Sequence, residues 1–229
     1  MKIFFALKKS ILIIFIVLFL DQFLKIWIKT NMYLGQEIPV FGNWFIIHFT
    51  ENNGMAFGME FAGGYGKLFL SIFRIIAVSF IGWYLFKLSN KKETPFGIIL
   101  SISLIFAGAV GNILDSAFYG LLFNDSTFQI ATFMPEGGGY AGFLHGKVVD
   151  MFYFPIIHGN FPQWFPIWKG EEFEFFRPVF NISDTSITIG VLLLILFQRN
   201  FFNKDNFKNN IEDVAENKEI PSSDEISSL

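Results

Sequence analysis

The sequence predicts an integral membrane protein that is mainly α-helical, with four transmembrane helices and a small sheet outside the membrane. The composition is the first indication, because 52% of the 229 residues are hydrophobic, 19% are aromatic and only 16% are charged. This departs strongly from an average soluble protein. The second indication is a series of long apolar stretches, and the third is the placement of basic residues between them.

Each apolar stretch has about the 17 to 25 residues that a membrane helix requires. The four predicted spans are roughly Ser10 to Ile28, Leu68 to Leu88, Phe96 to Tyr119 and Ser186 to Phe202.

Basic residues predict the orientation of these spans. They precede the first span, join the second to the third and follow the fourth: Lys2, Lys8, Lys9, Lys87, Lys91, Lys92, Arg199, Lys204 and Lys208. The positive-inside rule places these regions in the cytoplasm. We therefore expect both termini in the cytoplasm, and two long loops, about 29–67 and 120–185, outside it.

The two outer loops differ in pattern. In the first, "EIPVFGNWFIIHFTENNGMAFGM" mixes β-favouring residues with Gly and Asn, which predicts a few short strands joined by turns. The second is rich in Phe, Trp and Tyr, a composition typical of the lipid headgroup level. We expect one membrane domain over residues 1–202, followed by a disordered cytoplasmic tail over 203–229 with few large apolar residues.

Composition also excludes several classes of function. A net charge of -3 provides no basic face for nucleic acid. The absence of cysteine excludes thiol nucleophiles and thiolate metal sites, and the three histidines show no metal-ligand spacing. The stretch "PEGGGYAGFLHG" lacks the G-K-[ST] of a phosphate-binding loop. We expect neither a metal nor an organic cofactor.

Polar residues within the spans require partners or a task, because an ionisable group at membrane depth costs at least about 2.5 kcal/mol. Asp21 and Lys25 are spaced for an ion pair on one helix face, which is equally consistent with a structural pair. Asn112 and Asp115 follow small residues, so helix packing through hydrogen bonds is a full alternative to chemistry there. Arg74 either extends to the interface or neutralises a carboxylate.

Three further features lie in the outer loops. "NNGMAFG", from Asn52 to Gly58, is a turn signal or a segment that contacts a backbone or headgroup. Asp184 precedes the last apolar stretch, where an acid alone is more often a helix N-cap. Asp150 alone is more often a loop or strand-end acid, but both acids lie near the points where this loop re-enters the membrane.

Two carboxyl groups brought together share one proton. The ionised partner can then take a proton from water while the protonated partner polarises a carbonyl group, as in an aspartic protease. The sequence shows no cysteine nucleophile and no obvious Ser-His-Asp arrangement that would compete with this assignment.

The ordered motifs "DQxxK" (Asp21 to Lys25), "NNGxAFG" (Asn52 to Gly58), "GNxxD" (Gly111 to Asp115), "VVD" (Val148 to Asp150) and "FNxxD" (Phe180 to Asp184) resemble the lipoprotein signal peptidase, or signal peptidase II, family. The resemblance covers about residues 10–200. It implies a four-helix bundle with a small extracytoplasmic β-cradle and an outer flap, in the bacterial cytoplasmic (inner) membrane. It also implies an active site at the outer face.

The resemblance further implies that Asp150 and Asp184 are a catalytic dyad. Supporting or substrate-binding roles are implied for Asp21, Lys25, Asn52, Gly54, Arg74, Asn112, Asp115 and Asn181. The implied substrates are diacylglyceryl-modified prolipoproteins, cut just before the lipidated Cys, and the implied inhibitors are globomycin-type peptides. Membrane lipid is the expected surrounding partner, and a monomer is expected.

The chain departs from the family at two places. Ser116 stands where the family commonly has Arg, so Arg74, Lys147 or Arg177 would have to replace it. Insertions around Phe123 to Gly146 and Ile157 to Phe176 enlarge the second outer loop. Two other functions stay open: a small transporter or channel with an intramembrane acid/base relay, and a non-catalytic protein that docks partners through its aromatic loops.

Overall fold

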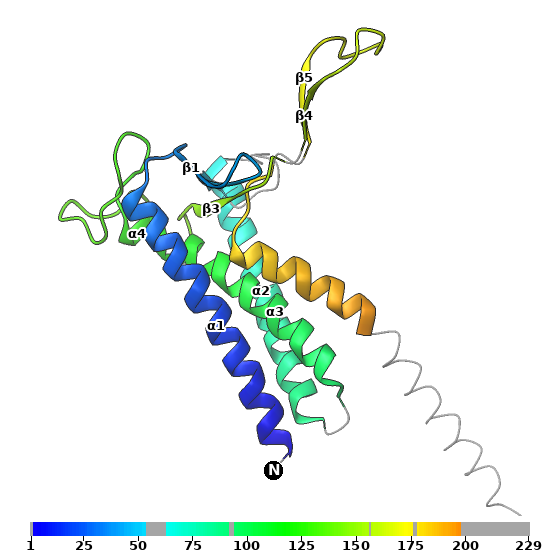
Figure 1. Ribbon diagram of the computed structural model, residues 1–229. Coiled ribbons are helices and arrows are strands. Elements are labelled where there is room, and N and C mark those ends of the chain that lie inside the picture. Colours follow the sequence, from blue (N-terminus) through cyan, green and yellow to red (C-terminus); the bar gives the residue numbers. More distant parts are fainter. Residues whose placement is uncertain (1, 54–62, 92–93, 156, 176–177, 198–229) are drawn as a thin grey trace, which may run out of the picture.

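Three long helices are the main elements of the fold, and a small sheet lies at one end of them (Figure 1). The computed structural model describes residues 2–53, 63–91, 94–155, 157–175 and 178–197. The helices are α1 (Lys2–Asn31), α2 (Gly63–Asn90) and α3 (Phe96–Leu114). They run side by side, and the N-terminus lies at the end of the bundle that is farthest from the sheet.

Three of the predicted spans are confirmed. The helices long and apolar enough to cross a membrane are Leu7–Asn31, Gly66–Asn90 and Phe96–Leu122. A fourth, shorter apolar helix covers Ile182–Phe197, and residues 198–202 of the predicted span lie outside the described part of the chain. The count of four membrane spans therefore stays a prediction.

The helices expose apolar side chains and bury polar ones, the reverse of a soluble protein. Phe15, Phe69 and Ile76 are 64%, 74% and 64% exposed. The buried Ser10 and Ser103 hydroxyls of α1 and α3 lie 2.6 Å apart and form a hydrogen bond. This distribution fits helices whose outer faces contact lipid and whose polar groups find partners inside the bundle.

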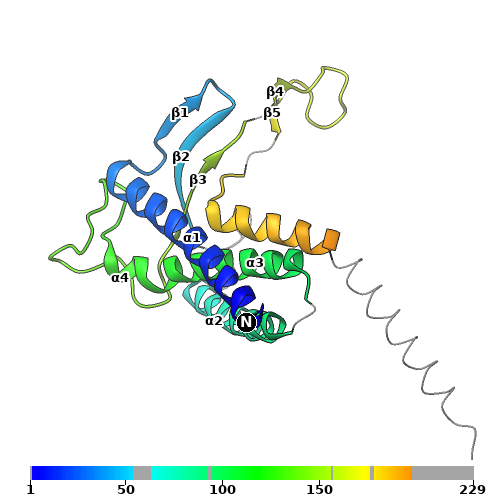
Figure 2. The ribbon, with the colours of Figure 1, turned by 60° about the horizontal axis from the view of Figure 1, so that its bottom comes forward.

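The helix Ile182–Phe197 packs antiparallel along α3, and small residues allow the two backbones to approach closely (Figure 2). A methyl group at Gly108 would overlap the backbone oxygen of Ser183. At the other end of the contact, a methyl at Gly190 would lie 2.7 Å from the backbone oxygen of Ser101. Close backbone contact of this kind is how membrane helices associate when the solvent is as apolar as their side chains.

The sheet is antiparallel and has the order β1 (Glu37–Phe41), β2 (Phe45–Asn52) and β3 (Val148–Tyr153). The first outer loop thus contains short strands, as predicted, and the second loop contributes β3. In the β2–β3 ladder Thr50 pairs with Asp150. One buried cluster joins apolar residues of the sheet, of the end of α1 nearest the sheet and of the second loop, and it includes Ile28, Phe49, Tyr119, Phe123 and Met151.

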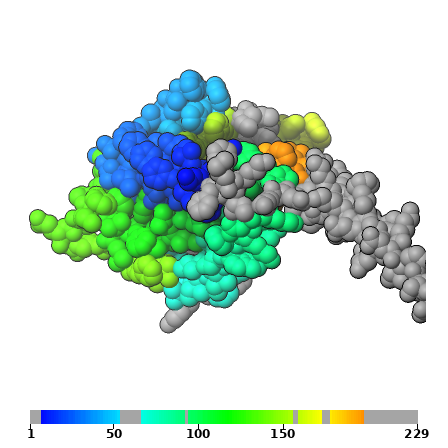
Figure 3. All heavy atoms as spheres, turned by 90° about the horizontal axis from the view of Figure 1, so that it is seen from below, coloured from blue at the N-terminus to red at the C-terminus, as the bar shows by residue number. Residues whose placement is uncertain are grey.

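The second outer loop has three parts. The π-helical turn η2 (Asp115–Tyr119) and α4 (Gly120–Leu122) extend α3. The segment 123–147 follows and lies beside the last turn of α1. In the view from below, this green to yellow-green segment spreads to the left of the helices (Figure 3). The hairpin of β4 (Ile157–Asn160) and β5 (Glu172–Phe175) projects beyond the sheet (Figure 1).

Candidate active site

Asp150 and Asp184 come from different elements that one backbone contact brings together. Asp150 lies in β3, and Asp184 lies in the first turn of the helix Ile182–Phe197. Phe180 forms an isolated bridge with Phe152 of β3, with backbone N–H to oxygen distances of 2.7 and 3.1 Å in the two directions. This bridge fixes the start of the helix beside the strand that carries Asp150.

Asn181, rather than Asp184, caps this helix. The Asn181 Oδ1 accepts the backbone N–H of Asp184 at 2.9 Å, and the Asp184 Oδ2 accepts the backbone N–H of Asn181 at 3.4 Å. This reciprocal arrangement is a capping box, with Asn181 at the N-cap and Asp184 three residues later. The reading of Asp184 alone as the N-cap was therefore wrong, because the helix begins before it.

The side-chain amide of Asn181 links the cap to Asp150. Its Nδ2 donates to Asp150 Oδ1 at 2.7 Å and to the Val149 backbone oxygen at 3.2 Å, and Asn181 is fully buried. The other oxygen of Asp150 accepts a hydrogen bond from the Asn52 side chain. Two amide donors thus hold the Asp150 carboxyl in one orientation.

Burial, and after it the nearby negative charge of Asp184, raise the pKa of Asp150 to about 7. The positive charge of Lys25 and the hydrogen bonds from Asn181 and Asn52 act in the opposite direction. Asp150 is 2% exposed. Its carboxyl group is therefore poised to hold or release a proton near neutral pH.

Asp184 is only partly buried, and other donors orient it. Asn112 Nδ2 donates to Asp184 Oδ1 at 2.8 Å, while the Asn112 oxygen accepts from Asn181 Nδ2 at 3.3 Å. Arg74 of α2 interacts with Asp184 electrostatically. Asn112 and Asn181 therefore connect the two acids through a continuous set of hydrogen bonds.

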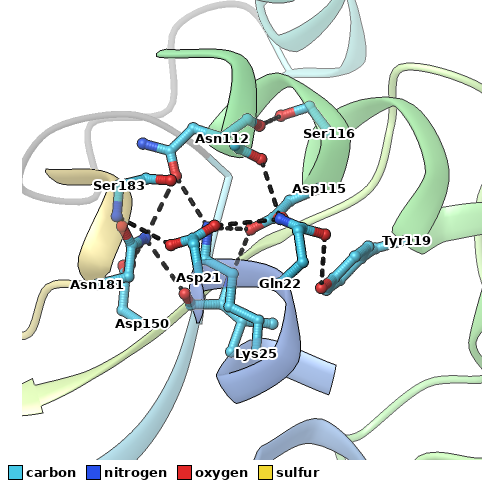
Figure 4. A network of polar contacts seen from close by, with 12 residues as sticks. Asp21, Gln22, Lys25, Asn112, Asp115, Ser116, Tyr119, Asp150, Asn181 and Ser183 are labelled. Carbon is cyan, nitrogen blue, oxygen red and sulfur yellow. Dashed lines mark hydrogen bonds and ion pairs between the residues drawn. The ribbon is translucent and has the colours of Figure 1, made fainter. Parts of the chain in front are cut away.

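A buried ion-pair network lies next to these hydrogen bonds (Figure 4). Lys25 Nζ lies 2.9 Å from Asp21, 2.8 Å from Asp115 and 3.1 Å from Asn112 Oδ1, so each ammonium proton has an acceptor. The side chains of Asp21, Lys25 and Asp115 are 0% exposed. Asp21 Oδ1 also accepts the backbone N–H of Ser183 at 2.9 Å, in the same helical turn as Asp184.

Two further residues of this network were not predicted. Gln22 Nε2 donates to Asp115 at 2.8 Å and Asp21 at 3.1 Å, and its oxygen accepts from Tyr119 at 3.2 Å (Figure 4). Gln22 is part of the "DQxxK" motif, so its position next to Asp21 in the sequence could have indicated that it belongs to the network. Tyr119 is the last residue of the π-helical turn η2, whose geometry the sequence does not indicate.

Of the remaining predicted residues, two lie outside the described part of the chain and the others have identified contacts. Gly54 and Arg177 lie outside the described part of the chain. Lys147 pairs with Glu51 at 3.3 Å, and Ser116 is buried with its hydroxyl donating to the backbone oxygen of Asn112 at 3.1 Å. Of the two described cations that were expected to replace the family arginine, Arg74 interacts electrostatically with Asp184, and Lys147 pairs with Glu51.

The fold and the site together define a membrane protein with a pair of carboxyl groups at the end of its helix bundle that carries the sheet. Comparison with known proteins identifies the family to which it belongs. The model of the signal peptidase (SPase) II family matches residues 13–199. The chain belongs to the signal peptidase II family, a family of membrane proteases that act on lipoprotein signal peptides.

Similar proteins agree with this placement. The chain is 53% identical to a lipoprotein signal peptidase of Porphyromonas gingivalis over 184 residues, which cover 80% of each chain. It is 37% identical to one of Amoebophilus asiaticus over 182 residues, or 79% of this chain and 73% of that one. A bacterial membrane enzyme solved by the in meso method at 2.3 Å resolution is 27% identical, with a TM-score of 0.54, covering 86% of this chain and 92% of that chain.

Proposed function

We propose that this protein is an aspartic endopeptidase that removes the signal peptide from diacylglyceryl-modified prolipoproteins, cutting just before the lipidated Cys. Asp150 and Asp184 are the proposed catalytic pair. The observation that carries the proposal is the bridge between them, in which Asn181 caps the helix of Asp184 and donates to Asp150 at 2.7 Å. Two oriented carboxyl groups of this kind are what water activation and carbonyl polarisation require.

The proposed reaction uses only these side chains and water. Asp184 takes a proton from a water molecule that attacks the scissile carbonyl, while Asp150 donates its proton to the carbonyl oxygen. The raised pKa of Asp150 favours it as the proton donor near neutral pH. Collapse of the tetrahedral intermediate breaks the peptide bond as Asp184 gives its proton to the leaving amine. One hydroxyl of the intermediate then returns a proton to Asp150 as the new carboxyl group forms, so both acids regain their starting states.

The surrounding amides keep both acids in place during these steps. Asn112 donates to Asp184 at 2.8 Å, and Asn52 and Asn181 donate to Asp150. Asn112 and Asn181 are also placed to hydrogen-bond a developing oxyanion if the substrate displaces one of their present partners. The buried Asp21–Lys25–Asp115 group is proposed to fix the helices that carry these residues.

Membrane confinement supplies part of the substrate positioning in this proposal. The signal helix of the substrate would pack among the spans while its diacylglyceryl group stays in the outer leaflet, which brings the scissile bond to the depth of the pair. We propose a location in the bacterial cytoplasmic membrane with both termini inside, and inhibition by globomycin-type peptides. Arg74 and Gly54 are proposed to contact or support the substrate.

The test is cleavage by the purified protein in lipid. A prolipoprotein with its diacylglyceryl-modified Cys is compared with the same precursor lacking the lipid, and products are followed by gel shift and mass spectrometry. The expected result is one cut directly before the modified Cys, with little or no cutting of the unmodified precursor. Absence of cleavage with verified substrate and folded protein would contradict the proposal.

A further inference from the structure

A second buried polar cluster lies across the sheet from Asp150. Glu51 of β2 forms an ion pair with Lys29 in the last turn of α1, and Lys29 also donates to the Ser126 hydroxyl at 2.7 Å. The Ser126 hydroxyl donates to Glu51 Oε1 at 3.0 Å, and Lys147 Nζ lies 3.3 Å from Glu51 Oε2. Both oxygens of Glu51 are therefore bound by cations.

The inserted segment encloses this cluster. The side chains of Lys29 and Glu51 are 0% and 2% exposed. The Tyr140 ring lies 5.1 Å from Lys29 Nζ and 5.5 Å from Lys147 Nζ, and the backbone N–H of Ala131 donates to the Lys29 oxygen at 3.2 Å. The insertion predicted around Phe123 to Gly146 is thus attached to α1 and to the residue before β3.

The position of Glu51 connects the cluster to the candidate active site. Glu51 immediately precedes Asn52, the residue that donates to Asp150, and neighbouring residues of a strand point to opposite faces of the sheet. Asn52 is also the last residue of β2 and pairs with Val148, which Lys147 immediately precedes. The Glu51 carboxylate therefore joins the end of β2 to Lys147, the residue before β3. This contact lies next to the point where Asn52 donates to Asp150.

We propose that Lys29 and Glu51 are positioning residues for the peptidase reaction, with the inserted segment as their cover. The buried ion pair fixes the end of β2 so that the Asn52 amide stays directed at Asp150. This inference rests on the proposed function and adds residues that the family motifs in this sequence do not include.

The chemistry of the pair suits positioning better than stabilisation. A buried ion pair adds little net stability, because desolvation of the charges offsets their attraction. It does fix geometry, since each charge is tied to particular donors or acceptors and leaving one unpaired is costly. Displacements of about 1 Å in a catalytic group can lower the rate about 100-fold.

The test is a double-mutant cycle between Glu51→Gln and Asn52→Ala, measured as kcat and KM for a diacylglyceryl-modified precursor in lipid. Glu51→Gln is expected to lower kcat about 10- to 100-fold with KM nearly unchanged. In the Asn52→Ala background the same change is expected to have almost no further effect, because the residue it positions is already gone. Effects that multiply independently would overturn the proposal.

Matched variants separate positioning from folding. Glu37→Gln changes an exposed acid on the neighbouring strand and is expected to keep the wild-type kcat. Lys29→Met combined with Glu51→Leu removes both buried charges, and is expected to keep the thermal midpoint but to show the lowered kcat. Wild-type kcat in this folded variant would overturn the proposal, as would a loss of folding in both Glu51 variants, which would make the cluster structural.

The outcomes also distinguish this inference from the proposed function. A wild-type protein that does not cleave contradicts the proposed function itself. A wild type that cleaves, together with a folded Glu51→Gln variant of equal kcat, contradicts the positioning role alone.

Discussion

At the scale of single residues, Asp150 determines the expected pH dependence. Burial and the charge of Asp184 raise its pKa to about 7, so its proton is lost as the pH rises through neutrality. Asp150 then has no proton to donate to the carbonyl oxygen. We expect kcat to fall on the alkaline side of about pH 7, and a pH profile of single-turnover cleavage in lipid measures this.

Removal of the Asn52 amide tests the cause of this dependence. A hydrogen bond to the carboxylate stabilises the charged form and lowers the pKa, so its loss raises the pKa of Asp150. Asn52→Ala is therefore expected to move the alkaline limb upward by about one pH unit while lowering kcat. A limb that stays in place, or moves to lower pH, would contradict this assignment.

Substitution of Lys25 tests the contribution of the buried ion-pair network of Asp21, Lys25 and Asp115. Lys25→Met leaves Asp21 and Asp115 buried without their cation, which is expected to destabilise the protein by about 3–5 kcal/mol. The expected result is a clearly lower thermal midpoint in detergent and loss of cleavage. Lys8→Met serves as the control because Lys8 is exposed near the other end of α1, and an equal midpoint in both variants would argue against the network.

At the scale of elements, the contact between α3 and the helix Ile182–Phe197 sets the position of Asp184. A methyl group at Gly108 would overlap the backbone of Ser183, one residue before Asp184. Gly108→Ala is therefore expected to push this helix outward, to cost about 1–3 kcal/mol and to lower kcat.

Gly137→Ala is the matched control, because a methyl group there has no heavy atom within 4 Å. Thermal midpoints and cleavage rates of the two alanine variants in the same lipid provide the comparison. Wild-type behaviour of Gly108→Ala would show that the two helices can separate without disturbing the site.

At the scale of the whole molecule, the topology can be tested by labelling, because the chain contains no cysteine. Thr127→Cys places a thiol in the exposed part of the second outer loop, and Lys91→Cys places one after α2. The positive-inside rule predicts that an impermeant maleimide labels the first in intact spheroplasts and the second only after permeabilisation. The opposite pattern would place the candidate site in the cytoplasm.

The structure shows which features of the molecule could be predicted from the sequence. The three long spans follow from local hydropathy, which depends on neighbouring residues alone. Asp150, Asp184 and their amide partners could be named as candidates from the sequence because ordered motifs contain them. Glu51 and Lys29 were missed because their pairing depends on contacts between α1, β2 and the inserted segment, and no local pattern encodes such contacts.

The length of the last helix shows a further limit. Hydropathy predicts a span that starts at Ser186, whereas the helix begins at Ile182, because Asn181 and Asp184 cap each other. This difference places Asp184 inside the first turn, where its carboxyl group faces the partners on α3 rather than only its own helix.

The central claim is that Asp150 and Asp184 act as one catalytic unit. The most direct measurement is single-turnover cleavage of a diacylglyceryl-modified precursor by Asp150→Asn, Asp184→Asn and the double variant, each with its folding verified. The account predicts that each single variant loses nearly all activity and that the double variant is no slower than either, because residues acting as a unit are not additive. Substantial cleavage by either folded single variant would contradict it.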